Sequence, residues 1–112
     1  MQVEEKRIEK YLVIKPIEIE IDSKVGRDFR EQMSEFIGSG NMFMLLNLPR
    51  AALIDSSGLG SIMSGLKQAR SRGALFICGL KETIIRMFNL TRMDRVLRIF
   101  ESEQEAIHTL TK

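Results

Sequence analysis

An apolar run at residues 42–48, MFMLLNL, constrains the fold of this chain more than any other feature. Six of its seven side chains are apolar, so the run lacks the alternation of a strand with one solvated face. Such a run is typical of a strand that is covered on both faces, in the middle of an α/β sheet. We therefore expect a central strand here, with helices on both sides of the sheet.

Beyond this run, segments with helical spacing alternate with short apolar runs. The first of the helical segments follows residue 55, and its apolar stripe is made by Leu59, Ile62, Met63, Leu66 and Ala69. The next patterns predict a strand over residues 74–78, a helix over 82–88, a strand over 96–100 and a helix after the capping box at 102–105. This order favours a mostly parallel sheet, because parallel neighbours need a crossover that a helix supplies.

The segment before the central run is predicted to hold further strands and one helix. Residues 3–15 form a strand pair or one irregular strand, and Pro16 marks an edge or a break because it cannot donate to a ladder. Residues 17–21, IEIEI, alternate as a half-buried strand does. Asp22 or Ser23 then caps a helix, and the face that it buries carries Val25, Phe29, Met33, Phe36 and Ile37.

The length of 112 residues fits one domain, residues 1–112, and the element order defines its class. We predict an α/β fold with a single open, mixed, mostly parallel sheet and about four helices. Direct nucleic-acid binding is not expected, because 17 basic residues are balanced by 15 acidic ones. No apolar stretch approaches the roughly 20 residues that a membrane span needs. The single cysteine, Cys78, excludes an internal disulfide and predicts a reduced, cytoplasmic setting, with Cys78 buried as a small hydrophobe.

The stretch LIDSSGLG, residues 53–60, lies where sites form in open parallel sheets, between a strand and the helix that follows it. In one interpretation Asp55, Ser56 or Ser57 only caps the helix. A serine nucleophile would need a histidine base, and the only histidine, His108, is expected to face solvent on the last helix. A phosphate cradle would need the third glycine of a dinucleotide fingerprint or the lysine of a P-loop, and both are missing.

The remaining interpretation is that a serine accepts a phosphoryl group. A hydroxyl at an exposed helix start is open to a kinase, and a phosphate there gains from nearby N–H groups and the helix dipole. The phosphate would add about −1.5 to −2 charges next to Asp55, which a docked partner would sense. The methionines are expected to fill core gaps rather than to bind copper. No metal or cofactor is expected to bind to the chain itself.

An uncharged stretch supports docking of another protein, because no charged residue occurs from Ser56 to Leu66. Surface helices normally carry charges on their solvent face. The positions off the apolar stripe are expected to form a small, smooth face: Ser57, Gly60, Ser61, Ser64 and Gly65. The alternative is that the glycines let the helix pack tightly on the rest of the fold.

The segment from residue 53 to residue 107 resembles the STAS domain, specifically the bacterial anti-sigma factor antagonists. The D-S-[ST]-G-L-G motif of that family is complete at residues 55–60. The resemblance implies a STAS fold and a protein that is not an enzyme but binds an anti-sigma factor serine kinase and so frees a sigma factor. It further implies that this kinase, which uses its own ATP, phosphorylates Ser56, and that a PP2C-type phosphatase removes the phosphate.

The same resemblance implies a contact surface for the kinase, made by Asp22, Asp55, Ser56, Ser57, Gly58, Leu59, Gly60, Ser61 and Ser64. The chain departs from the family pattern at Ile19, where glycine is usual, and at Pro49, where polar turn residues are common. These departures motivate an alternative, a STAS scaffold or accessory subunit of a transport or sensory assembly that is not phosphorylated. A monomer or weak dimer is expected in either case.

Two groups of charged residues near the C-terminus are expected to be solvated surface. The first consists of Arg92, Arg95 and Arg98, which could also meet an acidic partner. The second consists of Glu101, Glu103 and Glu105.

Overall fold

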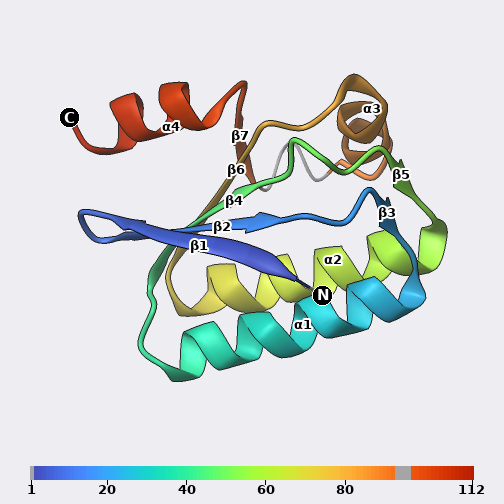
Figure 1. Cartoon of the computed structure of the whole chain (residues 1–112), viewed down its shortest axis with the longest axis horizontal. Helices are drawn as coiled ribbons and strands as arrows, with labels where there is room; N and C mark the ends of the chain where they lie inside the picture. Colours follow the sequence, from blue (N-terminus) through green and yellow to red (C-terminus); the bar gives the residue numbers. More distant parts are fainter. Residues whose placement is uncertain (1, 93–96) are drawn as a thin grey trace.

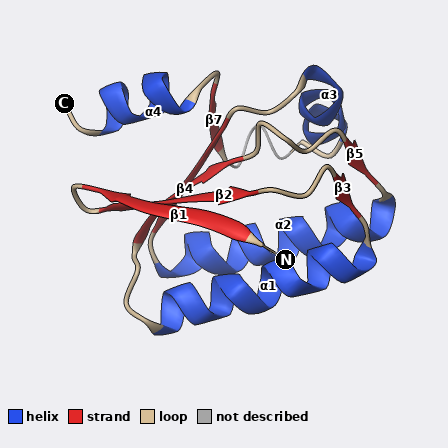
Figure 2. Cartoon of the chain, in the orientation of Figure 1, coloured by secondary structure: helices blue, strands red, loops and turns tan. Residues whose placement is uncertain are grey.

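The computed structural model describes residues 2–92 and 97–112 of the chain. Its main sheet has five strands in the order β1-β2-β4-β6-β7, and a separate parallel pair is formed by β3 and β5. Figures 1 and 2 show α1 and α2 side by side under one face of the main sheet and α4 on the other side. The elements are β1 Val3–Ile8, β2 Tyr11–Pro16, β3 Glu20–Ile21, α1 Ser23–Gly38, β4 Phe43–Asn47, β5 Leu53–Ile54, α2 Ser56–Arg72, β6 Ala74–Cys78, α3 Glu82–Leu90, β7 Arg98–Phe100 and α4 Glu103–Leu110.

The main sheet confirms the predicted mixed, mostly parallel class. Strand β4 pairs parallel with β2 and β6, and β6 pairs parallel with β7. Only β1 and β2 are antiparallel, with Val3 opposite Pro16. Residues 3–15 therefore form a strand pair rather than one irregular strand, and Pro16 ends the second of these strands.

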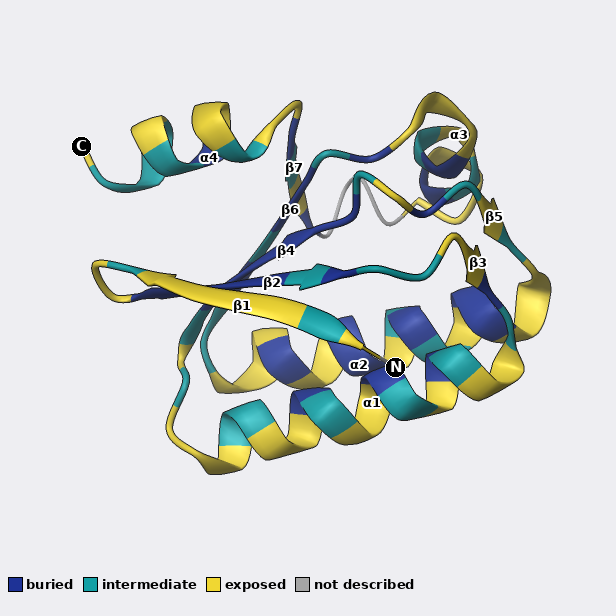
Figure 3. Ribbon diagram, viewed as in Figure 1, coloured by how far each residue is buried: buried dark blue, intermediate teal, exposed yellow. Residues whose placement is uncertain are grey.

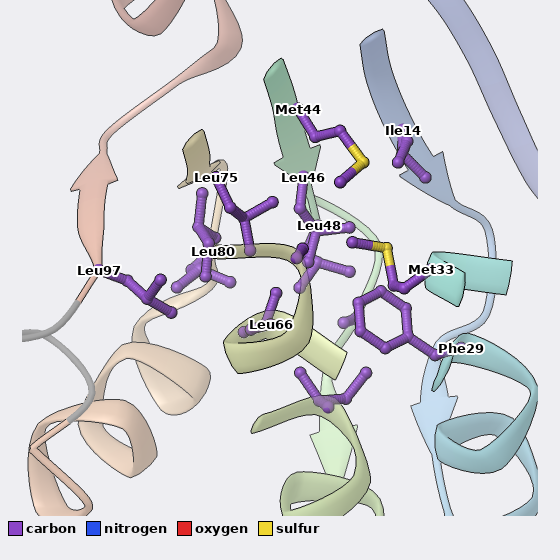
Figure 4. Packing of buried hydrophobic residues seen from close by; sticks show 14 of the residues in the cluster. Ile14, Phe29, Met33, Met44, Leu46, Leu48, Leu66, Leu75, Leu80 and Leu97 are labelled. Atoms are coloured by element: carbon purple, nitrogen blue, oxygen red, sulfur yellow. The ribbon is translucent and has the colours of Figure 1, made fainter. Parts of the chain in front are cut away.

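Strand β4 lies in the centre of the sheet, as its apolar sequence predicts. Met44 and Leu46 face the large core, which α1, α2 and α3 cover, and Figure 4 shows them beside Phe29 and Met33 of α1. Leu45 points the other way, into a smaller cluster under α4. Figure 3 shows the resulting buried band along the middle strands. Burial on both faces explains why the run carries so few polar residues.

The strand predicted over residues 17–21 is mostly wrong, because only Glu20 and Ile21 are in β3. The chain leaves the main sheet after Pro16, and the Ile17 N–H donates to the Gln2 carbonyl at 3.1 Å. The Ile19 carbonyl accepts from two successive backbone N–H groups in the chain just before and at β5. These backbone hydrogen bonds join segments that are far apart in the sequence. The local alternation of side chains therefore cannot predict them.

The other predicted elements are confirmed with small shifts. Helix α3 ends at Leu90, two residues beyond the prediction, and β7 is described from Arg98 onward. The predicted beginning of that last strand and Arg95 lie outside the described residues. Arg92, Arg98 and His108 are exposed, as expected.

The prediction that Glu103 is solvated surface is wrong, while Glu101 and Glu105 are exposed as expected. The Glu103 carboxylate is paired with Lys6 of β1 and accepts a hydrogen bond from Asn47 Nδ2 at 3.1 Å. Partial burial alone would raise the pKa of Glu103, but these hydrogen bonds outweigh it and hold the pKa below its ordinary value. Helix α4 is therefore attached to the sheet by polar as well as apolar contacts.

Beneath α4, Cys78 is fully buried, as expected. Desolvation by the surrounding protein, with a smaller contribution from the charge of Glu103, raises the pKa of its thiol to about 12. Among the helices that the structure describes, none has the length and apolar character needed to cross a membrane.

Candidate partner-docking site

Helix α2 begins with an aspartate that supplies its N-cap. The Gly58 N–H donates to Asp55 Oδ1 at 2.7 Å, so Asp55 satisfies one of the free N–H groups of the first turn. Of the three candidate caps in the sequence, the structure assigns this role to Asp55. Ser56 and Ser57 are exposed, and within the described chain neither hydroxyl is engaged in a hydrogen bond. A capping role therefore does not account for the two serines.

Helix α1 begins beside α2 and is capped in the same way. The parallel register of β3 and β5 aligns Ile21 with Ile54, so Asp22 and Asp55 follow at the same level. The Val25 N–H donates to Asp22 Oδ1 at 2.9 Å. Figure 1 shows β3 and β5 running side by side into the starts of the two helices. The structure thus places Asp22 on the same surface as the serine motif.

Close backbone packing brings the two helix starts together. A Cβ atom on Gly58 would lie 2.2 Å from the Ile21 carbonyl oxygen, so only glycine lets the first turn of α2 approach β3 this closely. One turn farther on, a Cβ atom on Gly26 of α1 would lie 2.6 Å from Ser61 Cβ. Because Gly58 and Gly26 have no side chains, the two helix starts pack closely, and this packing determines where Ser56 lies relative to Asp22.

The small face predicted on α2 is divided between exposure and packing. Ser57, Gly60 and Ser64 are exposed, as an interface requires. Gly65 is buried, because a Cβ atom there would lie 2.8 Å from Phe29 Cε2, and Ser61 is half-buried against α1. At Gly65 and Ser61, the alternative that small residues let the helix pack tightly is correct. The prediction of an open face is wrong for Gly65.

Two further residues of the expected contact surface, Gly58 and Leu59, are buried. Gly58 has no side chain to present, and Leu59 belongs to the large core. Their place in the motif is explained by packing of the helix start against β3. The solvent-accessible part of the expected surface therefore consists of Asp22, Asp55, Ser56, Ser57, Gly60, Ser61 and Ser64.

The segments that lead into the two helices carry only acidic charge. Residues 17–23 and 51–66 contain Glu18, Glu20, Asp22 and Asp55 and no lysine, arginine or histidine. Glu20 and Asp55 are exposed, and Asp22 is half-buried. Just outside these segments, the exposed Arg50 and Lys24 carry positive charge, so the acidic character is confined to the residues directly before the two helices. A phosphate on Ser56 would add negative charge beside Asp55.

A feature that sequence reasoning missed lies on the same surface. Ile19 and Leu53 are 63% and 62% exposed, and they are among the large apolar residues that the structure describes as exposed. The IEIEI alternation placed Ile19 in a half-buried strand, and nothing in the sequence singled out Leu53. The only available signal was that Ile19 stands where the family usually has glycine.

The structure separates the histidine of the chain from the serine motif. His108 is exposed on α4, on the opposite side of the main sheet from α2, so its imidazole cannot act as a base for Ser56 (Figure 1). Among the described residues, no group of three or more His, Cys, Asp or Glu side chains is arranged to hold a metal ion.

The sequence model of the STAS domain matches residues 3–106 of this chain. The chain belongs to the STAS domain family. This STAS protein is 32% identical over 79 residues to a candidate anti-sigma factor antagonist of Thermotoga maritima, with 70% of each chain covered. A homologue in Thermotoga neapolitana is 34% identical over 74 residues, which cover 65% of this chain and 66% of the relative. These relatives place the chain with the anti-sigma factor antagonists.

Solved structures agree with this assignment. The STAS protein superposes on the crystal structure of a candidate antagonist from Thermotoga maritima with a TM-score of 0.86 and 25% identity, covering 98% of this chain and 95% of the other. SpoIIAA, a Bacillus cell fate determinant solved in its phosphorylated form, shares the fold with a TM-score of 0.71 and 20% identity, covering 97% and 99%. The predicted STAS fold is confirmed.

Proposed function

We propose that this STAS protein binds an anti-sigma factor serine kinase, thereby frees a sigma factor, and is switched off when the kinase phosphorylates Ser56. The observation that carries the proposal is the position of the Ser56 hydroxyl. It is exposed at the start of α2, while the neighbouring Asp55 side chain supplies the cap. Phosphorylation there leaves the cap of the helix intact.

The chemistry of the switch belongs to the partners. In the forward step, Ser56 Oγ forms a bond to the γ-phosphorus of the kinase's ATP, the bond to the bridging oxygen breaks, and ADP leaves. The serine proton passes to a base of the kinase. A PP2C-type phosphatase restores the hydroxyl by adding water and releasing inorganic phosphate. The STAS protein contributes a positioned substrate side chain and uses no cofactor or metal of its own.

Phosphorylation is expected to release the kinase for three physical reasons. The phosphate adds about −1.5 to −2 charges to a surface that already carries Asp55 and Asp22. Ser57 and Gly60 are small, so a docked protein comes close and must strip water from the new charge. The nucleotide in the kinase brings negative phosphates of its own to the same place.

The test uses the serine kinases of the host that have the anti-sigma fold, purified one at a time. Wild-type protein is incubated with each kinase and ATP, and mass spectrometry maps the phosphate. We expect transfer to Ser56, binding without phosphorylation by Ser56→Ala, and binding by Ser56→Asp that is at least about tenfold weaker. Equal affinities of the wild type and Ser56→Asp would refute the charge switch.

The setting of this proposal is the cytoplasm, where sigma factors act, with the protein as a monomer or weak dimer that does not touch nucleic acid. A second candidate is a scaffold or accessory subunit in a transport or sensory assembly. The departures from the family pattern at Ile19 and Pro49 motivate this candidate. A stable complex with a transporter component, together with unmodified Ser56 under several growth conditions, would support this scaffold role.

A further inference from the structure

We infer that Ile19 and Leu53 form an apolar anchor that inserts into an apolar depression of the kinase, with lysine or arginine side chains at its rim. The inference rests on the proposed function and adds a recognition element outside the D-S-S-G-L-G motif. The anchor would determine which kinase the protein recognises, while Ser56 determines whether the complex persists.

The two anchor residues are neighbours through their backbones. The N–H groups of Ala52 and Leu53 donate to the Ile19 carbonyl at 2.8 and 3.1 Å. The β3–β5 pairing continues directly from this point, with Glu20 beside Leu53. Leu53 lies three residues before Ser56, and Ile19 lies three residues before Asp22. The anchor is therefore on the same end of the molecule as the starts of α1 and α2 (Figures 1 and 3).

Packing within the molecule does not require these two side chains. In the same strand pair, Ile21 is buried and Ile54 packs against the large core, so the inward positions are already filled. Single exposed apolar residues are common on protein surfaces. Here two large aliphatic residues are more than half exposed, are linked through a backbone hydrogen bond and lie near the proposed switch, as a docking surface requires.

The charges around the anchor identify the chemistry of its occupant. Glu20, which pairs with Leu53 in the strand register, and Asp55, two residues after Leu53, are exposed and acidic. The exposed basic residues Lys24 and Arg50 lie just outside residues 17–23 and 51–66, and Arg50 is paired with Glu4. A second copy docked symmetrically would bring the carboxylates beside the two anchors together, and these carboxylates would also oppose contact with an anionic membrane. A protein with an apolar depression and a basic rim complements both features.

The anchor and the switch are expected to make separable contributions. The anchor side chains do not take part in phosphoryl transfer, so their loss weakens docking without changing the reacting groups. Removing them should raise the KM of the kinase for this protein and leave kcat unchanged. Changes at Ser56 abolish transfer itself.

The experiment compares Ile19→Ser and Leu53→Ser with a matched control, Met42→Ser. Met42 is also exposed, by 56%, but precedes β4 at the other end of the sheet. The probe is the host kinase that phosphorylates Ser56. We expect each anchor variant to bind this kinase about tenfold more weakly, because burying an aliphatic side chain contributes at least that factor. The control should bind like the wild type, and Leu53→Met should retain most of the affinity.

Melting curves of all variants establish that the fold is intact, as expected for exposed positions. Wild-type affinity and KM in both serine variants, with Ser56 still phosphorylated, would overturn the anchor and leave the proposed function standing. A fall in kcat at unchanged KM would also overturn it. If no host kinase of this fold phosphorylates Ser56, the proposed function fails, and the anchor inference that rests on it fails too.

Discussion

Gly58 and Gly60 lie two residues apart on α2, yet their surroundings predict opposite effects of the same substitution. A methyl group on Gly58 would meet the Ile21 carbonyl at 2.2 Å, whereas a methyl group on Gly60 would meet nothing within 4 Å. We expect Gly58→Ala to lower the free energy of unfolding by about 1–3 kcal/mol through overpacking. Gly60→Ala should raise it by up to about 1 kcal/mol, because alanine favours the helix.

Urea denaturation of the two variants, compared with the wild type, measures both effects. Equal stabilities of Gly58→Ala and Gly60→Ala would contradict the close approach of α2 to β3. Because Gly58→Ala pushes the start of α2 away from Asp22, its affinity for the kinase should also fall. Gly60→Ala tests whether added bulk on the exposed face alone disturbs docking.

The cap at Asp55 gives a second prediction at the residue scale. Asp55→Ala removes the acceptor of the Gly58 N–H and should cost about 1 kcal/mol of stability. Asp55→Asn keeps an acceptor and should cost much less, since asparagine caps as well as aspartate. Comparing the melting temperatures of the two variants separates the contribution of the capping hydrogen bond from the contribution of the negative charge. A loss of similar size in both variants would show that the negative charge, rather than the hydrogen bond, stabilises the helix start.

The sequence predicts the residues of the motif but not which of them face solvent. Capping chemistry, the hydroxyl groups and the resemblance to the family all point to Asp55 and Ser56. The burial of Gly65 could not be predicted, because it depends on the position of Phe29 in a helix that precedes it by many residues. The exposure of Leu53 depends in the same way on where β3 pairs with β5.

At the scale of elements, periodicity predicted most helices and strands because burial follows spacing along the chain. The helix over Ser23–Gly38 and the central strand are the clearest cases. Residues 17–21 show the limit of this reasoning, since an alternating pattern is realised as a strand only where a partner strand is available. Here the backbone groups of Ile17 and Ile19 bond to separate segments instead.

The attachment of α4 predicts a dependence of stability on pH. Glu103 has a lowered pKa in the folded protein, so it stabilises the fold when ionised and loses this contribution as the pH falls below its ordinary value of 4.5. The wild type should therefore lose more stability on acidification through this range than Glu103→Gln. At neutral pH the wild type should be the more stable of the two, because it keeps the pair with Lys6.

Glu105 provides the matched control for this measurement, because it lies on the same helix and is exposed. Denaturant midpoints of the wild type, Glu103→Gln and Glu105→Gln are compared from neutral pH down to about pH 3. Glu105→Gln shows the effect of removing one carboxylate from this helix without removing the contact to the sheet. A curve for Glu103→Gln that coincides with the curve for Glu105→Gln would mean that the contact with Lys6 and Asn47 contributes nothing to stability.

At the scale of the whole molecule, the proposed docking surface occupies one end and does not include the α4 side of the sheet. The acidic residues at this end predict that the complex with the kinase weakens as salt screens the attraction. Glu20→Gln should reduce the slope of affinity against salt concentration. Glu35→Gln, an exposed position near the far end of α1, should leave the slope unchanged, and isothermal titration at several salt concentrations distinguishes the two variants.

The buried thiol of Cys78 makes the molecule convenient for fluorescence work. With a pKa of about 12, only about one thiol in a hundred thousand is ionised at neutral pH, and the surrounding protein blocks reagents as well. A cysteine introduced at an exposed position would therefore react selectively with a maleimide dye in an otherwise natural background. A dye on Glu35→Cys, an exposed position outside the proposed docking surface, would report the binding and release of a partner through its fluorescence anisotropy.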